Sequence, residues 1–194
     1  MTKTIITTHT RPEFDALTSG YALNPCDLLG LHQFDTGWLI RIYNPYAVSL
    51  TLLGNGAEAG LQRVDSRGVF EWRGAVPPVH PYCIRHTYPD AEVVEHDPYA
   101  FPLQLTEHDL YLFNEGRLYQ AYQMLGSQPG RVDDVVGVRF ALWAPNADRV
   151  SIVGDFHHWD GRTHPMRAHG GSGVWELFIP GIIAGSHYKY EIHN

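Results

Sequence analysis

The sequence lacks the features of a membrane protein or of a nucleic-acid-binding protein. Its 14 Lys and Arg are outnumbered by 21 Asp and Glu and are scattered, so no basic patch for nucleic acid is predicted. No apolar run reaches the roughly 18–20 residues that span a bilayer, and none near the N-terminus has signal-peptide length. We therefore expect a soluble, cytoplasmic chain with neither a membrane nor a nucleic acid as partner.

Cysteine is scarce, and clustered metal ligands are missing. Cys26 and Cys83 lie far apart without a CxxC or zinc-ligand neighbour, so reduced structural thiols are predicted. Only His157 and His158 are adjacent among 12 histidines, and neighbours in an extended segment cannot easily face one ion. No Ser-His-Asp set, phosphate-binding glycine loop or paired-carboxylate pattern is seen. We expect no metal, no cofactor and no catalytic residue here.

Glycine and proline are plentiful and indicate an all-β fold. The 19 Gly and 13 Pro separate short runs rich in β-branched and aromatic residues, which is typical of β-sandwiches. The length of 194 residues is enough for two small domains.

A short helix is predicted near the N-terminus. Thr10 and Glu13 have capping-box spacing, Pro12 suits an early helical position and Gly20 can end the turn. Phe14 and Leu17 share one face of this helix, which we interpret as a lid or flank.

A second helical segment is predicted from about Thr106 to Leu125. Thr106 can cap it, apolar residues recur at three- or four-residue spacing, and Gly116 interrupts it. We interpret it as a connector between domains.

An internal repeat organises the chain. Residues 37–54 overlay residues 137–154 at an offset of 100, with the same apolar class at alternate positions. Two further matches are Gly68–Glu71 with Gly173–Glu176, at an offset of 105, and Tyr82-x-Ile84 with Tyr188-x-Tyr190, at 106. We predict two copies of one β-sandwich, about residues 25–96 and 137–194, although any two strand-turn-strand units share some of these features.

The predicted fold is two tandem immunoglobulin-like β-sandwiches joined by a short helical connector. The predicted segments are a flank (1–24), a first module (25–105), the connector (106–130) and a second module (131–194).

The loop 154–161 of the second copy carries the candidate site. Trp159 lies among polar residues, and an indole face packs against the C–H face of a pyranose while polar groups meet its hydroxyls. Lys189 is out of phase with the apolar residues of its predicted strand and can donate to a sugar, and His157 and Asp160 complete the candidate set. The alternative is that Trp159 folds back over the sandwich edge.

The other tryptophans and the first copy contrast with this loop. The corresponding residues of the first copy, 54–60, contain no aromatic side chain, so we expect this copy to pack against another surface. Four tryptophans lie within strand patterns and are interpreted as structural: Trp38, Trp72, Trp143 and Trp175.

Several motifs of the second half resemble the family 48 carbohydrate-binding module of bacterial 1,4-α-glucan branching enzymes. They are residues 137–147, 153–156, 159–162, 164–167, 173–180 and 188–192. The first half is similar to the extra N-terminal domain of the long branching enzymes. Its matching residues are Pro25, 28–32, 97–99, 109–116 and 122–126.

The resemblance implies glucose contacts at Trp159 and Lys189. His157 stands where the family often has Asn, which changes the polar contact. In the complete enzyme a barrel of the family 13 glycoside hydrolase type would follow, so the chain is expected to end within its second module and to be inactive alone. The implied partners are α-1,4-glucan or glycogen and the catalytic domain of the same parent chain.

Three interpretations are compatible with the sequence. The second module binds glucan while the first supports the barrel or chain-length preference, or both modules only brace the barrel, or the chain is the front of a related debranching enzyme.

Overall fold

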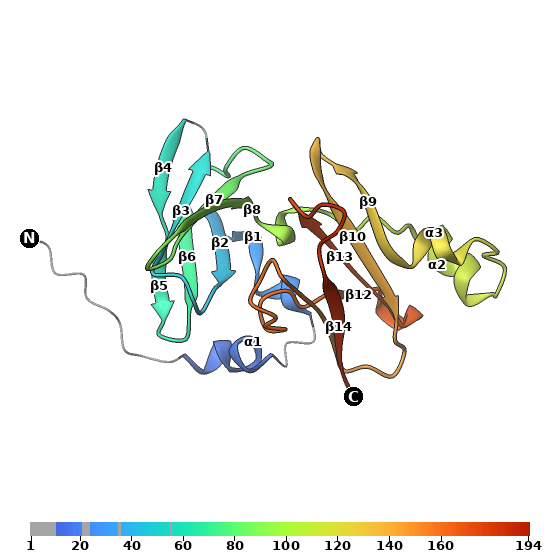
Figure 1. Ribbon diagram of the computed structural model, residues 1–194. Helices are drawn as coiled ribbons and strands as arrows, with labels where there is room; N and C mark the ends of the chain where they lie inside the picture. Colours follow the sequence, from blue (N-terminus) through green and yellow to red (C-terminus); the bar gives the residue numbers. More distant parts are fainter. Residues whose placement is uncertain (1–10, 21–23, 35, 55) are drawn as a thin grey trace, which may run out of the picture. The chain divides into compact units, whose positions relative to one another are not determined.

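The computed structural model describes residues 11–20, 24–34, 36–54 and 56–194. Contacts divide the chain into two compact units, which Figure 1 shows. The first comprises the described residues of Met1–Ser19 and Leu28–Ala100, and the second those of Gly20–Asp27 and Phe101–Asn194. Within the described ranges, no helix is long and apolar enough to cross a bilayer.

The first unit is a sandwich of two antiparallel sheets. One has the order β1-β2-β6-β5, with the strands Gly30–Phe34, Gly37–Tyr43, Val69–Gly74 and Gln62–Asp65. The other has the order β4-β3-β7-β8, with the strands Ala57–Gly60, Ser49–Gly54, Cys83–Thr87 and Glu92–His96. Ile40 and Phe70 of one sheet pack in one buried cluster with Leu50 and Ile84 of the other. Alternating apolar residues therefore meet between the sheets, as the sequence predicts.

The N-terminal helical segment contributes to the core of this unit. A 3₁₀ turn, η1 (Pro12–Phe14), leads into α1 (Asp15–Ser19), and Gly20 follows with φ +81°. Phe14 and Leu17 are buried in one cluster with four residues of the module, namely Leu29, Tyr43, Val64 and Val69. The predicted cap Thr10 lies outside the described residues.

The second unit has the same layered plan with fewer strands. Its larger sheet has the order β12-β13-β10-β9, with the strands Arg167–Ala168, Val174–Pro180, Val135–Trp143 and Gly126–Val132. The other sheet pairs β11 (Arg149–Gly154) with β14 (Tyr188–His193). The rings of Phe140 in β10 and Tyr188 in β14 are 4.8 Å apart, which joins the two sheets. Both units are all-β in their main elements, which confirms the predicted fold class.

Short helical elements complete the chain. Three single turns are η2 (Pro25–Asp27), η3 (Pro98–Ala100) and η4 (Gly170–Ser172). The connector segment forms α2 (Glu107–Asn114) and α3 (Ala121–Met124). Thr106 caps α2 as predicted, because its hydroxyl accepts from Asp109 N–H at 3.2 Å and its own N–H donates to the Asp109 carboxylate at 3.0 Å. Gly116, with φ +67°, separates the two helices.

The strand pairing confirms the internal repeat. Equivalent strands meet in the same register in both units, at the offsets of 100, 105 and 106 residues that the sequence predicts. The equivalent cross-strand pairs are Ile40–Trp72 with Phe140–Leu177, and Leu52–Ile84 with Ile152–Tyr190.

One glycine contact recurs in both units. Gly68 has φ +105°, and a Cβ there would lie 2.5 Å from Pro45 Cα. Gly173 has φ +74°, and a Cβ there would lie 2.8 Å from Pro145 Cα. Only glycine fits this left-handed turn under a proline without strain, which explains why both copies keep the pair.

The segment after the second repeated strand differs between the units. In the first unit, the residues interpreted as a loop, 54–60, instead include β4, and Leu52 lies opposite Ala59. The loop interpretation was therefore wrong for Ala57–Gly60, because a tight turn lets the chain pair back on β3. In the second unit no strand follows directly, and the chain runs through a long loop to an isolated bridge between Ser151 and Pro165.

Candidate functional site

Trp159 lies in the loop that follows β11 and is 43% exposed. His158 and Trp159 are both left-handed, with φ of +52° and +58°. The left-handed backbone conformation costs about 1–2 kcal/mol of free energy at each residue that is not glycine. The surrounding contacts must therefore hold this loop in its conformation.

Asp155 holds the indole in place. Trp159 Nε1–H donates to Asp155 Oδ1 at 3.2 Å, and the other carboxylate oxygen lies 3.0 Å from His187 Nδ1. The bond from His187 lowers the pKa of Asp155, so the carboxylate stays ionised and accepts from both sides. The orientation of the aromatic ring is thus set by residues of the loop and of the turn before β14.

Lys189 lies beside this ring. It is exposed on β14, and its Nζ lies 5.9 Å from the centroid of the Trp159 indole. This is at the outer limit of a cation–π contact. An apolar ring next to an ammonium donor matches the two needs of a pyranose, a stacking surface and a hydrogen-bond partner.

His157 points into the second unit. Its ring centroid lies 3.9 Å from that of His164, and its Nδ1–H donates to the Phe156 carbonyl. Burial lowers the pKa of His157 to about 4, so the ring is neutral near pH 7. Direct contact of His157 with a sugar stays a prediction.

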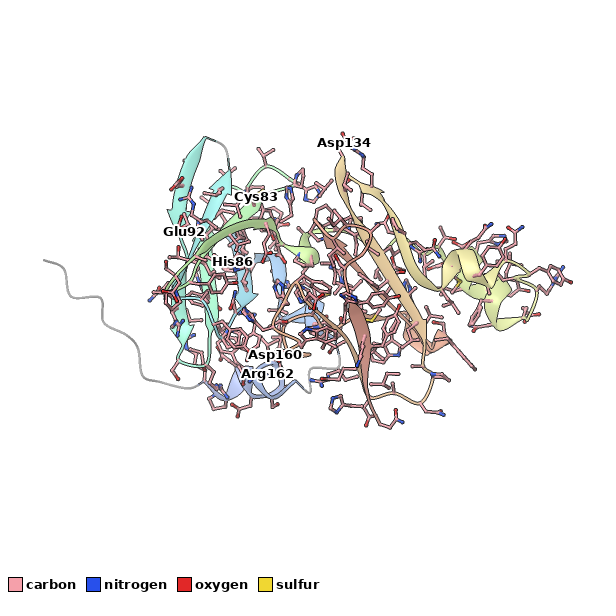
Figure 2. The ribbon with its side chains drawn as sticks, in the orientation of Figure 1. Cys83, His86, Glu92, Asp134, Asp160 and Arg162 are labelled. Atoms are coloured by element: carbon pink, nitrogen blue, oxygen red, sulfur yellow. The ribbon has the colours of Figure 1, made fainter. Side chains whose placement is uncertain are left out.

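Asp160 is engaged within the loop. Its Oδ2 lies 2.7 Å from Arg162 Nη2, and its Oδ1 accepts from Arg162 Nε at 2.9 Å and from Arg162 N–H at 3.0 Å (Figure 2). The side chain of Asp160 is only 10% exposed. Direct contact of Asp160 with a sugar also stays a prediction.

The other tryptophans differ in exposure. Trp175 is buried and donates to the Ala144 carbonyl at 3.1 Å, and Trp72 packs against the core of the first unit, so both are structural as predicted. Trp143 is 52% exposed and meets Phe113 of α2 edge-on, at 6.1 Å between ring centroids. Trp143 is the last residue of β10, and the pairing of β10 with β9 ends two residues earlier, at Ala141.

Sequence reasoning missed the pair formed by Asp155 and His187. The two residues are 32 positions apart, and their contact depends on the pairing of β11 with β14. The only signal was that both residues flank these strands. In the described residues, no three His, Cys, Asp or Glu side chains gather where a metal ion could bind.

Two sequence families match the chain. The family "alpha-1,4-glucan branching enzyme GlgB, N-terminal domain" matches residues 10–99. The family "Carbohydrate-binding module 48 (Isoamylase N-terminal domain)" matches residues 124–194.

Curated relatives cover nearly the whole chain. The 1,4-alpha-glucan branching enzyme GlgB of Nitrosospira multiformis is 50% identical over 188 residues, which are 94% of this chain and 25% of the relative. The enzyme of the same name from Nitrosomonas europaea is 53% identical over 173 residues, 88% of this chain and 23% of the relative. The chain thus spans about a quarter of the length of these relatives.

Solved structures give a weaker likeness. Pullulanase type I from Bacillus subtilis str. 168, complexed with maltose, is 16% identical with a TM-score of 0.29, over 85% of this chain and 23% of that one.

Proposed function

Because residues 10–99 belong to the GlgB N-terminal domain family and residues 124–194 to carbohydrate-binding module family 48, we propose that the chain is a non-catalytic N-terminal region of a 1,4-α-glucan branching enzyme. In this proposal the second unit binds α-1,4-glucan. The parent enzyme builds the branches of glycogen in the cytoplasm, and its catalytic domain lies in the rest of the parent chain.

The exposed Trp159 with Lys189 beside it is the observation that supports glucan binding most strongly. If the indole covers roughly 100 Å² of sugar at about 25 cal/mol per Å², it contributes about 2.5 kcal/mol. Association costs about 4 kcal/mol or more, so one platform binds a short oligosaccharide no better than about millimolar. Repeated contacts along a polymer then supply retention.

His157 and Asp160 fit a positioning role in this proposal. His157 fills the space beneath the loop beside His164, and Asp160 fixes the following turn through Arg162. These contacts compensate for the two consecutive left-handed residues, His158 and Trp159. The platform thus keeps one orientation before a sugar arrives, which reduces the entropy lost on binding.

Retention on glycogen tests the site. Trp159→Ala should remove most of the retardation of the chain in a glycogen-containing gel, because it deletes the stacking surface. Trp143→Ala is the matched control, since it removes an indole of similar exposure from the same unit. Equal mobility of wild type and Trp159→Ala would refute the site, and so would an equal loss in both variants.

The first unit is proposed to support the catalytic domain or its chain-length preference. The support for this role is the edge strand β4, which occupies the place of the Trp159 loop and carries no aromatic side chain. Deleting residues 1–125 from the full-length enzyme should change the lengths of the branches made. The proposed segments are the flank (1–24), the first module (25–105), the connector (106–130) and the second module (131–194). The strand β9 (Gly126–Val132) begins in the proposed connector and pairs with β10 of the second module.

A further inference from the structure

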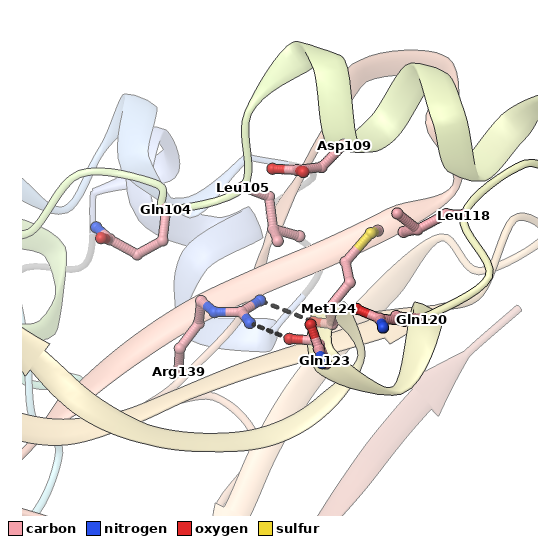
Figure 3. A pocket seen from close by; sticks show the side chains of 8 residues that line it. All are labelled: Gln104, Leu105, Asp109, Leu118, Gln120, Gln123, Met124 and Arg139. Atoms are coloured by element: carbon pink, nitrogen blue, oxygen red, sulfur yellow. Dashed lines mark hydrogen bonds between the residues drawn. The ribbon is translucent and has the colours of Figure 1, made fainter.

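A cavity of about 290 Å³ lies in the second unit, apart from the residues of the Trp159 loop. Its walls come from the segment before α2, from α2 and α3, and from β10 (Figure 3). We call it the connector cavity, and it is lined by Gln104, Leu105, Asp109, Leu118, Gln120, Gln123, Met124 and Arg139.

The lining of the connector cavity suits a neutral ligand with many hydroxyls. Three side-chain amides carry NH₂ donors and carbonyl acceptors. Gln104 Nε2 already donates to the Pro102 carbonyl at 2.6 Å and Gln123 Nε2 to the Tyr122 hydroxyl at 3.4 Å, so each of these two amides keeps one N–H for a ligand. One carboxylate and one guanidinium balance each other, so the cavity does not select a strongly charged ligand. Leu105, Leu118 and Met124 supply apolar surface for the C–H groups of a sugar ring.

Internal hydrogen bonds hold the walls of this cavity. Arg139 donates to the carbonyls of Met124 at 2.8 Å and of Gln123 at 3.1 Å, which fixes the end of α3 (Figure 3). The buried Glu176 carboxylate accepts from the N–H groups of Gln104 at 2.6 Å and Leu105 at 3.1 Å. The segment before α2 is therefore anchored to β13, and little reorganisation is needed on binding.

Polar atoms of the lining remain available to a ligand. The side chain of Gln120 makes no hydrogen bond with any residue that the structure describes, and the same holds for Asp109 Oδ1. Both bonds from Thr106 to Asp109 go to Oδ2, and they lower the pKa of Asp109, which keeps it an ionised acceptor. Arg139, by contrast, already donates from both Nη groups to backbone carbonyls, and the Asp109 carboxylate in the same lining repels an anion such as phosphate.

We infer that the connector cavity is a second subsite of the second unit for a short segment of α-1,4-glucan, an inference that rests on the proposed function. Its volume is near the lower end of the roughly 300–1,000 Å³ typical of ligand pockets, which admits roughly one or two pyranose rings. The described lining holds no aromatic ring, so hydrogen bonds hold the sugar here whereas stacking holds it at Trp159. Two subsites on one unit increase the retention of a polymer through avidity.

Titration with maltotriose, followed by residue-resolved NMR of the intact chain, tests the subsite. The side-chain amide signals of Gln104, Gln120 and Gln123 should shift saturably in the wild type and also in Trp159→Ala. Gln120→Leu combined with Gln123→Leu should weaken this response by about tenfold or more, because both amides lose their donors. The indole signal of Trp159 should still respond in the double variant.

A matched control and a second probe complete the experiment. Gln62→Leu replaces an exposed glutamine of β5 and should leave both responses unchanged. If the double variant loses spectral dispersion, Gln120→Leu alone replaces it. Inorganic phosphate should cause no shift at the cavity, and a response to phosphate without one to maltotriose would overturn the inference.

The two sites report separately. A Trp159 signal that moves while the cavity signals stay fixed overturns the second subsite and leaves the proposed function intact. Cavity signals that move while Trp159 stays fixed support the subsite and overturn the Trp159 platform. If neither set moves, both are overturned.

Discussion

The two units share a strand plan and differ in the segment that follows the second repeated strand. After β3 the chain turns at once into the edge strand β4 (Ala57–Gly60), whereas after β11 it runs into the loop that carries Trp159. The registers of the strands before this point are equivalent. The same scaffold therefore carries an additional strand in one copy and an exposed aromatic side chain in the other. Under the proposed function, the loop rather than the fold decides which copy binds a sugar.

A buried glutamate extends this comparison. Glu71 and Glu176 occupy equivalent positions on β6 and β13. Glu71 lies 2.8 Å from Arg41 Nη2 and 3.0 Å from Arg73 Nη2, which lowers its pKa against the effect of burial. Glu176 instead accepts two backbone N–H groups from the segment before α2 and faces His169 at 2.7 Å. One carboxylate stabilises its own sheet, and the other fixes the segment that lines the connector cavity.

The largest predicted loss of stability comes from substituting the equivalent glycine of each copy, and it tests whether the two copies are structurally equivalent. Gly68→Ala and Gly173→Ala should each destabilise their own unit by roughly 3–4 kcal/mol, because a Cβ meets proline at a left-handed residue. Urea unfolding followed by NMR signals of each unit measures both. Gly60→Ala and Gly130→Ala are matched controls, since a Cβ at either meets nothing within 4 Å. A large effect in only one unit would break the equivalence.

The next prediction is a loss of stability of the second unit in acid, which distinguishes it from the first unit. The folded second unit keeps His157 neutral with a pKa of about 4, below the ordinary 6.5. The contribution of neutral His157 to the stability of the folded state is fully present above pH 6.5. It is lost as pH falls toward 4, because His157 of the unfolded chain binds a proton at a higher pH than His157 of the folded chain. The free energy of unfolding should fall by about 2–3 kcal/mol over this pH range. His157→Asn should remove this slope in urea unfolding, while His158→Asn in the same loop should retain it.

In the first unit, a smaller dependence of stability on pH is expected, and its sign is opposite: stability falls as pH rises. Burial, and then the charge of Asp97, raises the pKa of Glu95 from 4.5 to about 7. The folded state therefore binds a proton that the unfolded state releases, so stability is highest below pH 4.5 and falls as pH rises through 7. After allowance for solvent screening, the free energy of unfolding should fall by about 1–2 kcal/mol as pH rises. Glu95→Gln should flatten this slope, and an unchanged slope would exclude Glu95 as its source.

The environment of Glu95 explains why glutamine is the suitable replacement. His86 Nε2 lies 3.3 Å from Glu95, and His86 Nδ1 lies 2.9 Å from Asn44 Nδ2. Asn44 Oδ1 accepts from the N–H groups of Tyr46 and Ala47, which assigns the amide donor to His86. His86 thus carries its proton toward residue 95, and the Glu95→Gln variant keeps a side-chain oxygen to accept it.

Much of the fold could be predicted because local patterns determine it. Glycines and prolines at equal spacing with alternating apolar residues predicted that the two copies are equivalent. Thr106 and Gly116 predicted the start and the interruption of the helical segment. The strand β4 was missed because Ala57–Gly60 contains no β-branched or aromatic residue, which are the residue types that favour strands. Exposure of Trp143 was also missed, since a strand pattern does not show where the neighbouring strand ends.

The candidate site was predictable only in part. Trp159 and Lys189 were found from composition and strand phase, and the structure places them 5.9 Å apart. The inward direction of His157 and the Asp155–His187 contact depend on loop packing and on pairing across β11 and β14. The connector cavity joins α2, α3 and β10, so no local sequence pattern reveals it.

The indole N–H signals of the five tryptophans test the central comparison most directly, because two lie in the first copy and three in the second. During titration of the intact chain with maltoheptaose, the Trp159 signal should shift most and saturate, while Trp38 and Trp72 stay in place. A saturable shift at Trp38 or Trp72, with Trp159 unmoved, would contradict the assignment of glucan binding to the second copy.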